Sequence, residues 1–178
     1  SAASDVYKRQ EPETQKCEAI LQAWYPGQQG GKAVAEVLFG DYNPAGKLPV
    51  TFYRNVSQLP DFEDYNMTGR TYRYMQDVPL FPFGYGLSYT TFGYGKTVLD
   101  KNELTAGQSL KLTVPVTNTG KRNGEEVVQV YLRKQGDAEG PIKTLRAFKR
   151  VSIPAGKTVN VEFDLKDKEL EWWDDQSN

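Results

Sequence analysis

Histidine is missing from the 178-residue sequence, and cysteine occurs once. Histidine is the commonest metal ligand and general base, so its absence excludes Ser-His-Asp and Cys-His catalysis and the usual zinc sites within this chain. The single cysteine, Cys17, excludes an intrachain disulfide, and its place beside an apolar run predicts a small buried side chain. Any catalysis here would depend on carboxylates, tyrosines, lysines or arginines.

The sequence also lacks an excess of either charge, because 22 basic residues are matched by 23 acidic ones and the net charge is −1. Nothing in it supplies the positive field that attracts nucleic acid or an anionic membrane, so we expect neither as a partner. No apolar run reaches the ~18–20 residues that cross a bilayer. An apolar content of 38% is typical of a globular protein with core enough for one domain or two small ones.

Aromatic residues are abundant but unevenly distributed. Counting Phe, Trp and Tyr, 17 fall in residues 1–94 and five in residues 95–178, which predicts two structural units. The change coincides with PLFPFGYGLSYTTFGYG, residues 79–95, which holds six aromatic residues and four glycines. We expect this segment to connect the units, since its glycines allow turns and its rings can fill the packing between them.

The first unit, residues 11–60, alternates between strand and helix patterns. EAILQAWYPG, residues 18–27, predicts a buried strand that ends at Pro-Gly, with Trp24 and Tyr25 filling a core rather than binding sugar. The next pattern predicts a helix that stops at Gly40, and Leu48–Tyr53 reads as a second strand. The apolar stripe of that helix consists of Ala33, Val34, Val37 and Leu38.

The glycine-rich loop before this helix permits two interpretations. Helix N-terminal amides can bind phosphate, but the GxxxxGK[ST] and GxGxxG patterns are both missing. A tight strand-to-helix connection is therefore favoured.

The second unit, residues 95–178, shows the period of two that indicates strands with one buried face. In SLKLTVPVTNTG, residues 109–120, apolar and polar side chains alternate, and Pro115 places this strand at a sheet edge because proline cannot donate to a ladder. Further strand patterns follow in EEVVQVYLRK, TLRAFKRVSI and TVNVEFDL, separated by turn signals. Short strands at regular spacing predict a β-sandwich, and without cysteine pairs it is closer to a fibronectin type III domain than to an antibody domain.

Three further motifs occur in order along the chain: AILQAWYPGQQGGKAVAEVLFGDYNPAGKLPVTF, PLFPFGYGLSYTTF and NTGKRNGEEVVQVYL. Over most of residues 16–173 they resemble the C-terminal portion of glycoside hydrolase family 3. The resemblance implies that residues 11–60 end an α/β sandwich domain and that residues 61–94 connect it to the next domain. Residues 95–178 would then form a fibronectin type III-like domain, incomplete at its C-terminus. Residues 1–10 look foreign to the family and are expected to be a non-native leader.

The same resemblance implies a parent enzyme that cleaves β-glycosidic bonds from chain ends with retention, in the breakdown of plant polysaccharides or oligosaccharides. Its substrates would be β-linked oligosaccharides or aryl glycosides, β-xylosides before β-glucosides, and no cofactor or metal is implied. The nucleophilic Asp and the acid/base Glu would lie upstream, in a barrel and α/β domain outside this chain, so this piece alone is expected to be inactive. A periplasmic or secreted location is expected for the parent.

One segment could still hold chemistry. LPDFEDYNMTGRTYRYM, residues 59–75, gathers three carboxylates, Asp61, Glu63 and Asp64, beside arginines and aromatic rings. A glycosidase needs two carboxylates at a defined separation, but acidic residues in a turn-rich connection are usually solvated or paired with arginine. Three roles remain open: a catalytic pair, packing against a neighbouring domain, or a rim of the sugar site. The rim candidates are Arg70, Tyr72 and Arg73.

A different class of function is also compatible with the sequence, namely a stand-alone module whose β-sandwich binds carbohydrate or protein. Such a module would be complete in itself, with paired edges and a concave aromatic face. The expectation that the last strand is truncated argues against it, because a sandwich without its closing strand exposes unpaired backbone groups.

Overall fold

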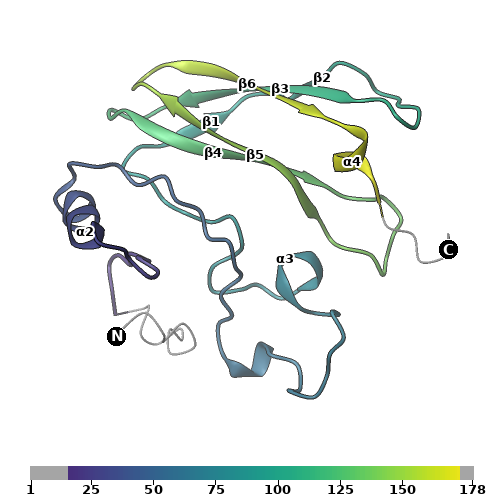
Figure 1. The fold of residues 1–178 in the computed structure, drawn as a ribbon, viewed down its shortest axis with the longest axis horizontal. Coiled ribbons are helices and arrows are strands. Elements are labelled where there is room, and N and C mark those ends of the chain that lie inside the picture. The colour runs from purple at the N-terminus through teal and green to yellow at the C-terminus, as the bar shows by residue number, and fades with distance from the viewer. Residues whose placement is uncertain (1–15, 173–178) are drawn as a thin grey trace. The chain divides into compact units, whose positions relative to one another are not determined.

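The computed structural model describes residues 16–172 (Figure 1). Within this range, residues 16–87 and 139–142 form one compact unit, and residues 88–138 and 143–172 form another. The predicted leader, residues 1–10, lies outside the described range. No helix within residues 16–172 is long and apolar enough to cross a membrane.

Among its described residues, the first unit contains one helix longer than a single turn, as the sequence predicts. α2, Gly30–Phe39, ends at Gly40, whose left-handed backbone (φ 80°) allows its N–H to donate to the Val37 carbonyl at 3.1 Å. A 3₁₀ turn, η3 (Val56–Gln58), and a single helical turn, α3 (Thr71–Tyr74), follow. Asn55 caps η3 by accepting a hydrogen bond from the Ser57 N–H at 3.1 Å.

The strand predicted over residues 18–27 does not form. This segment has no ladder partner among the described residues, and an extended chain is a stable strand only when neighbours pair with it. Tyr25, expected in a core, is 78% exposed, whereas the ring of Trp24 lies 6.5 Å from that of Phe52 and is partly covered. Cys17 is exposed, so the prediction of a small buried side chain there was wrong. Leu38 of the apolar stripe is also exposed.

The second predicted strand, Leu48–Tyr53, is extended backbone paired with a distant segment instead of a regular strand. The Leu48 N–H donates to the Tyr85 carbonyl at 2.8 Å, and the Phe52 N–H donates to the Phe81 carbonyl at 2.9 Å. Phe52 is one of two buried apolar residues among those described in this unit, and its ring meets that of Phe81 edge-on at 6.3 Å. The aromatic segment that begins at residue 79 therefore packs, in its first half, on the strand-like residues of its own unit.

The second unit is the predicted β-sandwich (Figure 1). One sheet contains β3 with β6 on one edge and the short strands β1 and β2 in succession on the other; the second sheet pairs β4 with β5. The strand bounds are β1 (Phe92–Tyr94), β2 (Val98–Leu99), β3 (Leu110–Asn118), β4 (Gly124–Leu132), β5 (Thr144–Ile153) and β6 (Thr158–Leu165), followed by the helical turn α4 (Asp167–Leu170).

The alternation in the sequence sets which side chains are buried. Along β3 the inward positions are buried and those between them are more accessible, and β6 repeats the pattern in register from Leu110 opposite Leu165 to Thr117 opposite Thr158. Both sheets supply the core, whose buried members are Leu112, Val114, Val116, Val128, Ile153, Val161, Phe163 and Leu165. The predicted sandwich is therefore confirmed, with β5 and β6 at the predicted residues.

The prediction that Pro115 marks an edge strand was wrong, because β3 is paired on both sides. The carbonyl of Pro115 accepts a hydrogen bond from the Gly95 N–H at 2.8 Å, so the ring nitrogen faces the same edge as Gly95. That edge is interrupted between β1 and β2, and the missing donor falls in the interruption. β3 can therefore contain a proline although it is a central strand, because the neighbouring edge is already interrupted where Pro115 has no N–H to donate.

A polar side chain, Asn118, ends β3 and is fully buried. Its Nδ2 donates to the carbonyls of Arg122 and Ile153 at 2.8 and 2.9 Å. Its Oδ1 accepts from the Thr90 hydroxyl at 2.7 Å and from the Gly120 N–H at 3.1 Å. Every hydrogen-bonding site of the amide is used, which is the condition for burying such a group without a large penalty.

A second polar contact joins the two sheets. The Tyr94 hydroxyl on β1 donates to Oε1 of Glu126 on β4 at 2.8 Å, and Glu126 is buried. Burial raises the pKa of Tyr94 strongly, and the hydrogen bond to the carboxylate raises it further, so the phenol stays protonated.

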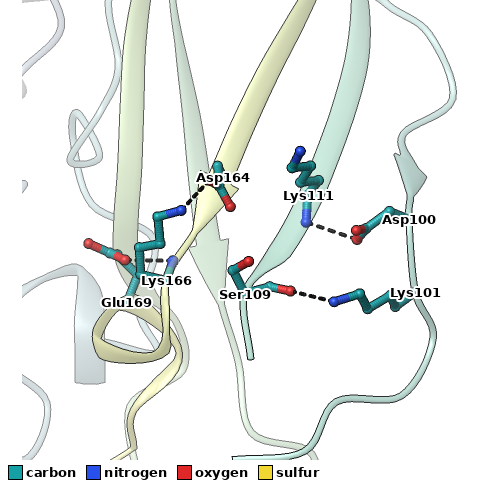
Figure 2. Close-up of polar contacts among 7 residues, drawn as sticks. All are labelled: Asp100, Lys101, Ser109, Lys111, Asp164, Lys166 and Glu169. Carbon is teal, nitrogen blue, oxygen red and sulfur yellow. Dashed lines mark hydrogen bonds and ion pairs between the residues drawn. The ribbon is translucent and has the colours of Figure 1, made fainter. Parts of the chain in front are cut away.

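Exposed polar contacts order the end of the sheet where β3 begins and β6 ends (Figure 2). The Lys111 N–H donates to the Asp100 carboxylate at 2.9 Å, and Lys101 Nζ donates to the Ser109 carbonyl at 3.2 Å. Lys166 pairs with Asp164 and lowers the pKa of that carboxyl. Because these groups are exposed, we expect their contacts to hold the local backbone in place and to add little to the free energy of unfolding.

We expect Gly95→Ala to destabilise the second unit. A Cβ at this position would lie 2.5 Å from Cγ of Pro115, inside van der Waals contact, so the central strand or its neighbour must shift. The free energy of unfolding should fall by about 1–3 kcal/mol, as for overpacked cores, in urea denaturation followed by circular dichroism. Gly93→Ala is the matched control, since its Cβ would meet its nearest atom at 3.4 Å; equal losses in both variants would refute the steric explanation.

We expect Asn118→Ala to cost about 3 kcal/mol or more, because each buried donor or acceptor left unpaired costs about 1–3 kcal/mol. Thr90→Val removes one of the four bonds and should cost less in the same urea titration. A loss no larger in Asn118→Ala than in Thr90→Val would mean that the amide does not organise the sandwich.

Candidate functional site

The 61–70 loop of the first unit is built from two tight turns. The Asp64 N–H donates to the Asp61 carbonyl at 3.1 Å, and the Arg70 N–H donates to the Met67 carbonyl at 3.0 Å. Gly69 lies at the third position of the second turn with φ 72°, a conformation that glycine adopts without strain. The loop thus has a defined backbone although it contains no helix or strand.

The side chain of Arg70 donates hydrogen bonds to two backbone carbonyls of its own loop. Its Nε donates to the Asn66 carbonyl at 2.7 Å, and Nη2 donates to the Asp64 carbonyl. The rigid guanidinium plane can bind two carbonyls at once, which a lysine cannot reproduce. Arg70, one of the three predicted rim residues, therefore holds the loop in shape.

Two of the three carboxylates of the segment accept hydrogen bonds from the backbone of their own turns. Oδ1 of Asp61 accepts from the Glu63 N–H at 3.0 Å, and Oδ1 of Asp64 accepts from the Asn66 N–H at 2.9 Å. The hydrogen bond from the Asn66 backbone lowers the pKa of Asp64, so this carboxyl is unsuited to act as a general acid at neutral pH. Both aspartates serve as turn-forming side chains.

The other two rim candidates follow the loop in α3. The ring of Tyr72 is half-buried and stacks on that of Phe83 at 4.1 Å. The guanidinium of Arg73 lies 5.6 Å from the centre of the Tyr74 ring, while its Nε is buried with no hydrogen-bond partner in the described part of the chain. The structure brings Arg70, Tyr72 and Arg73 into one short stretch, with Tyr72 packed and Arg73 retaining a free donor.

Thr71, between Arg70 and Tyr72, has a strained backbone. Its φ of 56° lies in the left-handed region, which is unfavourable for a β-branched residue. The Thr71 N–H donates to the Tyr53 hydroxyl at 3.2 Å, which helps to hold this conformation. Strain of this kind concentrates where geometry serves function, and no pattern in the sequence signals it.

Two side chains of the loop were missed by the sequence analysis. Phe62 is 94% exposed and Tyr65 is 89% exposed, although the loop that carries them is hydrogen-bonded. The only signal for them was the acidic and aromatic alternation of DFEDYN.

A groove of about 610 Å³ lies elsewhere in the first unit, between residues 21–30 and the face of α2. Its walls are mostly apolar and include Leu21, Pro26, Val34 and Val37. No group of three His, Cys, Asp or Glu side chains suited to a metal ion occurs in residues 16–172.

Comparisons with known proteins identify both parts of the sequence. Residues 3–89 match the glycosyl hydrolase family 3 C-terminal domain, and residues 126–178 match a fibronectin type III-like domain. The first match starts inside residues 1–10, whose assignment as a leader stays a prediction.

Individual relatives carry glycosidase names. A xylan 1,4-β-xylosidase of Xylanibacter ruminicola is 57% identical over 168 residues, which are 94% of this chain and 19% of the relative. A periplasmic β-glucosidase of Salmonella typhimurium is 40% identical, over 92% of this chain and 23% of its own. The solved β-glucosidase of Listeria innocua in complex with glucose superposes with a TM-score of 0.77 at 31% identity, covering 94% of this chain and 25% of its own. The chain thus spans about a fifth to a quarter of these relatives.

We expect Arg70→Lys to loosen the 61–70 loop, because lysine cannot bind the Asn66 and Asp64 carbonyls together. Amide hydrogen exchange over residues 62–70 should accelerate by roughly tenfold, equivalent to about 1.4 kcal/mol of local opening. Exchange in β3 and β6 should not change. Unaltered exchange in the loop would show that the guanidinium is not what holds it.

Proposed function

Because the chain belongs to glycoside hydrolase family 3, we propose that it is the C-terminal portion of a retaining β-glycosidase that releases sugars from chain ends. The observation that carries this proposal is the 57% identity to a β-xylosidase across both units of the chain. A second relative and a solved structure, both β-glucosidases, support the same class of reaction. We favour β-xylosides as substrates, with β-glucosides next, in the breakdown of plant polysaccharides or oligosaccharides.

The reaction requires two carboxylates, one as nucleophile and one as acid/base, and a covalent glycosyl-enzyme intermediate. Asp61 and Asp64 each use one carboxylate oxygen to bind the backbone of their own turn. We therefore place both catalytic carboxylates in the barrel and α/β parts of the parent enzyme and expect this chain alone to be inactive.

The contribution of this chain would be a rim for the sugar site, supplied by Arg70, Tyr72 and Arg73. The Arg73 guanidinium lies 5.6 Å from the centre of the Tyr74 ring, and arginine binds sugar hydroxyls as a donor. Arg70 would act by holding the loop, and Tyr72 by its packed ring. We also propose a periplasmic or secreted location for the parent, by analogy with the periplasmic β-glucosidase of Salmonella typhimurium.

A stand-alone binding module is the second candidate. Its sandwich would bind carbohydrate or protein without any catalytic partner. The large exposed apolar side chains of the first unit, such as Leu38, Phe39 and Val56, favour the enzyme, since a self-sufficient module would cover them.

The test is hydrolysis of aryl β-xyloside and aryl β-glucoside by the purified chain and by the same chain extended upstream to a full family 3 sequence. We expect release of the aryl group by the extended protein only, faster from the xyloside. Activity of the 178-residue chain alone would overturn the placement of the catalytic carboxylates. Inactivity of a folded extended protein on both substrates would favour the binding module.

A further inference from the structure

Residues 139–142 interrupt the second unit along the sequence. They lie in the connection between β4 and β5, yet they belong to the first compact unit, whereas the residues on either side of them belong to the second. Gly140, Pro141 and Ile142 are half-buried, although residues 133–136 of the same connection are exposed. Connections between strands usually run over the surface, so the half-buried part has a specific partner.

This partner is the helical turn α3. The Ile142 N–H donates to the Arg73 carbonyl at 2.6 Å. Within the turn, the N–H groups of Tyr74 and Met75 donate to carbonyls four residues earlier at 3.2 and 2.9 Å. Carbonyls in the last turn of a helix have no acceptor role within the helix itself, so Ile142 supplies a donor that α3 cannot supply.

α3 depends on such outside contacts. A helix of one turn is not stable by itself, because ordering the first turn costs more conformational entropy than its hydrogen bonds return. The left-handed backbone of Thr71 at its start adds strain. The Tyr53 hydroxyl binds the start of the turn, and the Phe83 ring stacks on its tyrosine. The Ile142 N–H binds its last residues.

The connection that carries Ile142 is held at both ends within the second unit. The Trp172 indole N–H donates to the Asp137 carboxylate at 3.2 Å, and Lys143 Nζ lies 4.8 Å from the centre of the Tyr131 ring. The part between these two contacts is short. Fixing the ends of a short segment lowers the entropy that it loses when it binds.

We propose that residues 139–142 act as a strap, which holds the last turn of α3 through the Ile142 N–H. The strap lies within residues 126–178, the part that matches a fibronectin type III-like domain. α3 carries Tyr72 and Arg73, so the order of both side chains depends on a segment encoded in the other part of the chain. This goes beyond the proposed function, because it gives the fibronectin type III-like part a role whichever sugar the parent cleaves.

The direct test is NMR of the 178-residue chain labelled with ¹⁵N and ¹³C. Ile142→Pro removes the donor, and we expect amide exchange at Tyr74 and Met75 to accelerate by roughly tenfold, as for the loss of one backbone hydrogen bond. The ¹³C resonance of the Arg73 carbonyl should shift, since it reports hydrogen bonding to that oxygen. Exchange in β3 and β6 should not change, which verifies that the variant is folded.

Two control variants separate the hydrogen bond from other effects of substitution. Ala138→Pro places a proline in the same connection at an exposed residue whose N–H has no acceptor among residues 16–172, and it should leave exchange in α3 unchanged. Ile142→Ala keeps the N–H and should accelerate exchange less than Ile142→Pro. Unchanged exchange in Ile142→Pro, or equal acceleration by Ala138→Pro, would overturn the proposal. No hydrolysis is measured, so this failure is distinguishable from failure of the proposed enzymatic function.

Discussion

The sandwich depends on the buried amide of Asn118, since this one side chain ties together segments that no single sheet connects. It binds Thr90 where the chain enters the unit, the loop that crosses from β3 to β4 in the other sheet, and the end of β5. Its backbone adds a further link, because the Asn118 N–H donates to the Lys157 carbonyl at 2.9 Å in the turn before β6. Hydrophobic burial between the sheets is not directional, whereas a fully satisfied amide fixes how they are arranged.

The extent to which sequence predicted structure differs between the two units for a physical reason. In the second unit the alternation of apolar residues matches the buried face of β3 and β6, which pair with each other, so pattern and tertiary packing agree. In the first unit the apolar run at residues 18–27 predicts a strand, but strand formation requires a neighbour that the run itself does not specify. The helix at Gly30–Phe39 was predictable because its hydrogen bonds and its glycine stop are local.

The residue types of the candidate site could be read from the sequence, but the roles of their side chains could not. The sequence named Arg70 and Tyr72 as candidates for the rim of a sugar site; in the structure their side chains bind the backbone of the loop and stack on the ring of Phe83. Side-chain-to-backbone bonds of this kind depend on turn geometry, which the pattern of acidic and aromatic residues does not encode. The strained Thr71 and the exposed Phe62 and Tyr65 become visible only once the backbone is known.

The contact between Pro115 and Gly95 also limits how this unit can associate with other chains. β1 and β2 form one edge of their sheet, but the chain departs from the ladder between them, so neither offers a long row of free backbone donors and acceptors. An extended foreign segment laid along that edge would find only short, broken stretches to pair with. Contacts made there must consequently come from side chains, which can be selective, instead of from backbone pairing, which accepts almost any sequence.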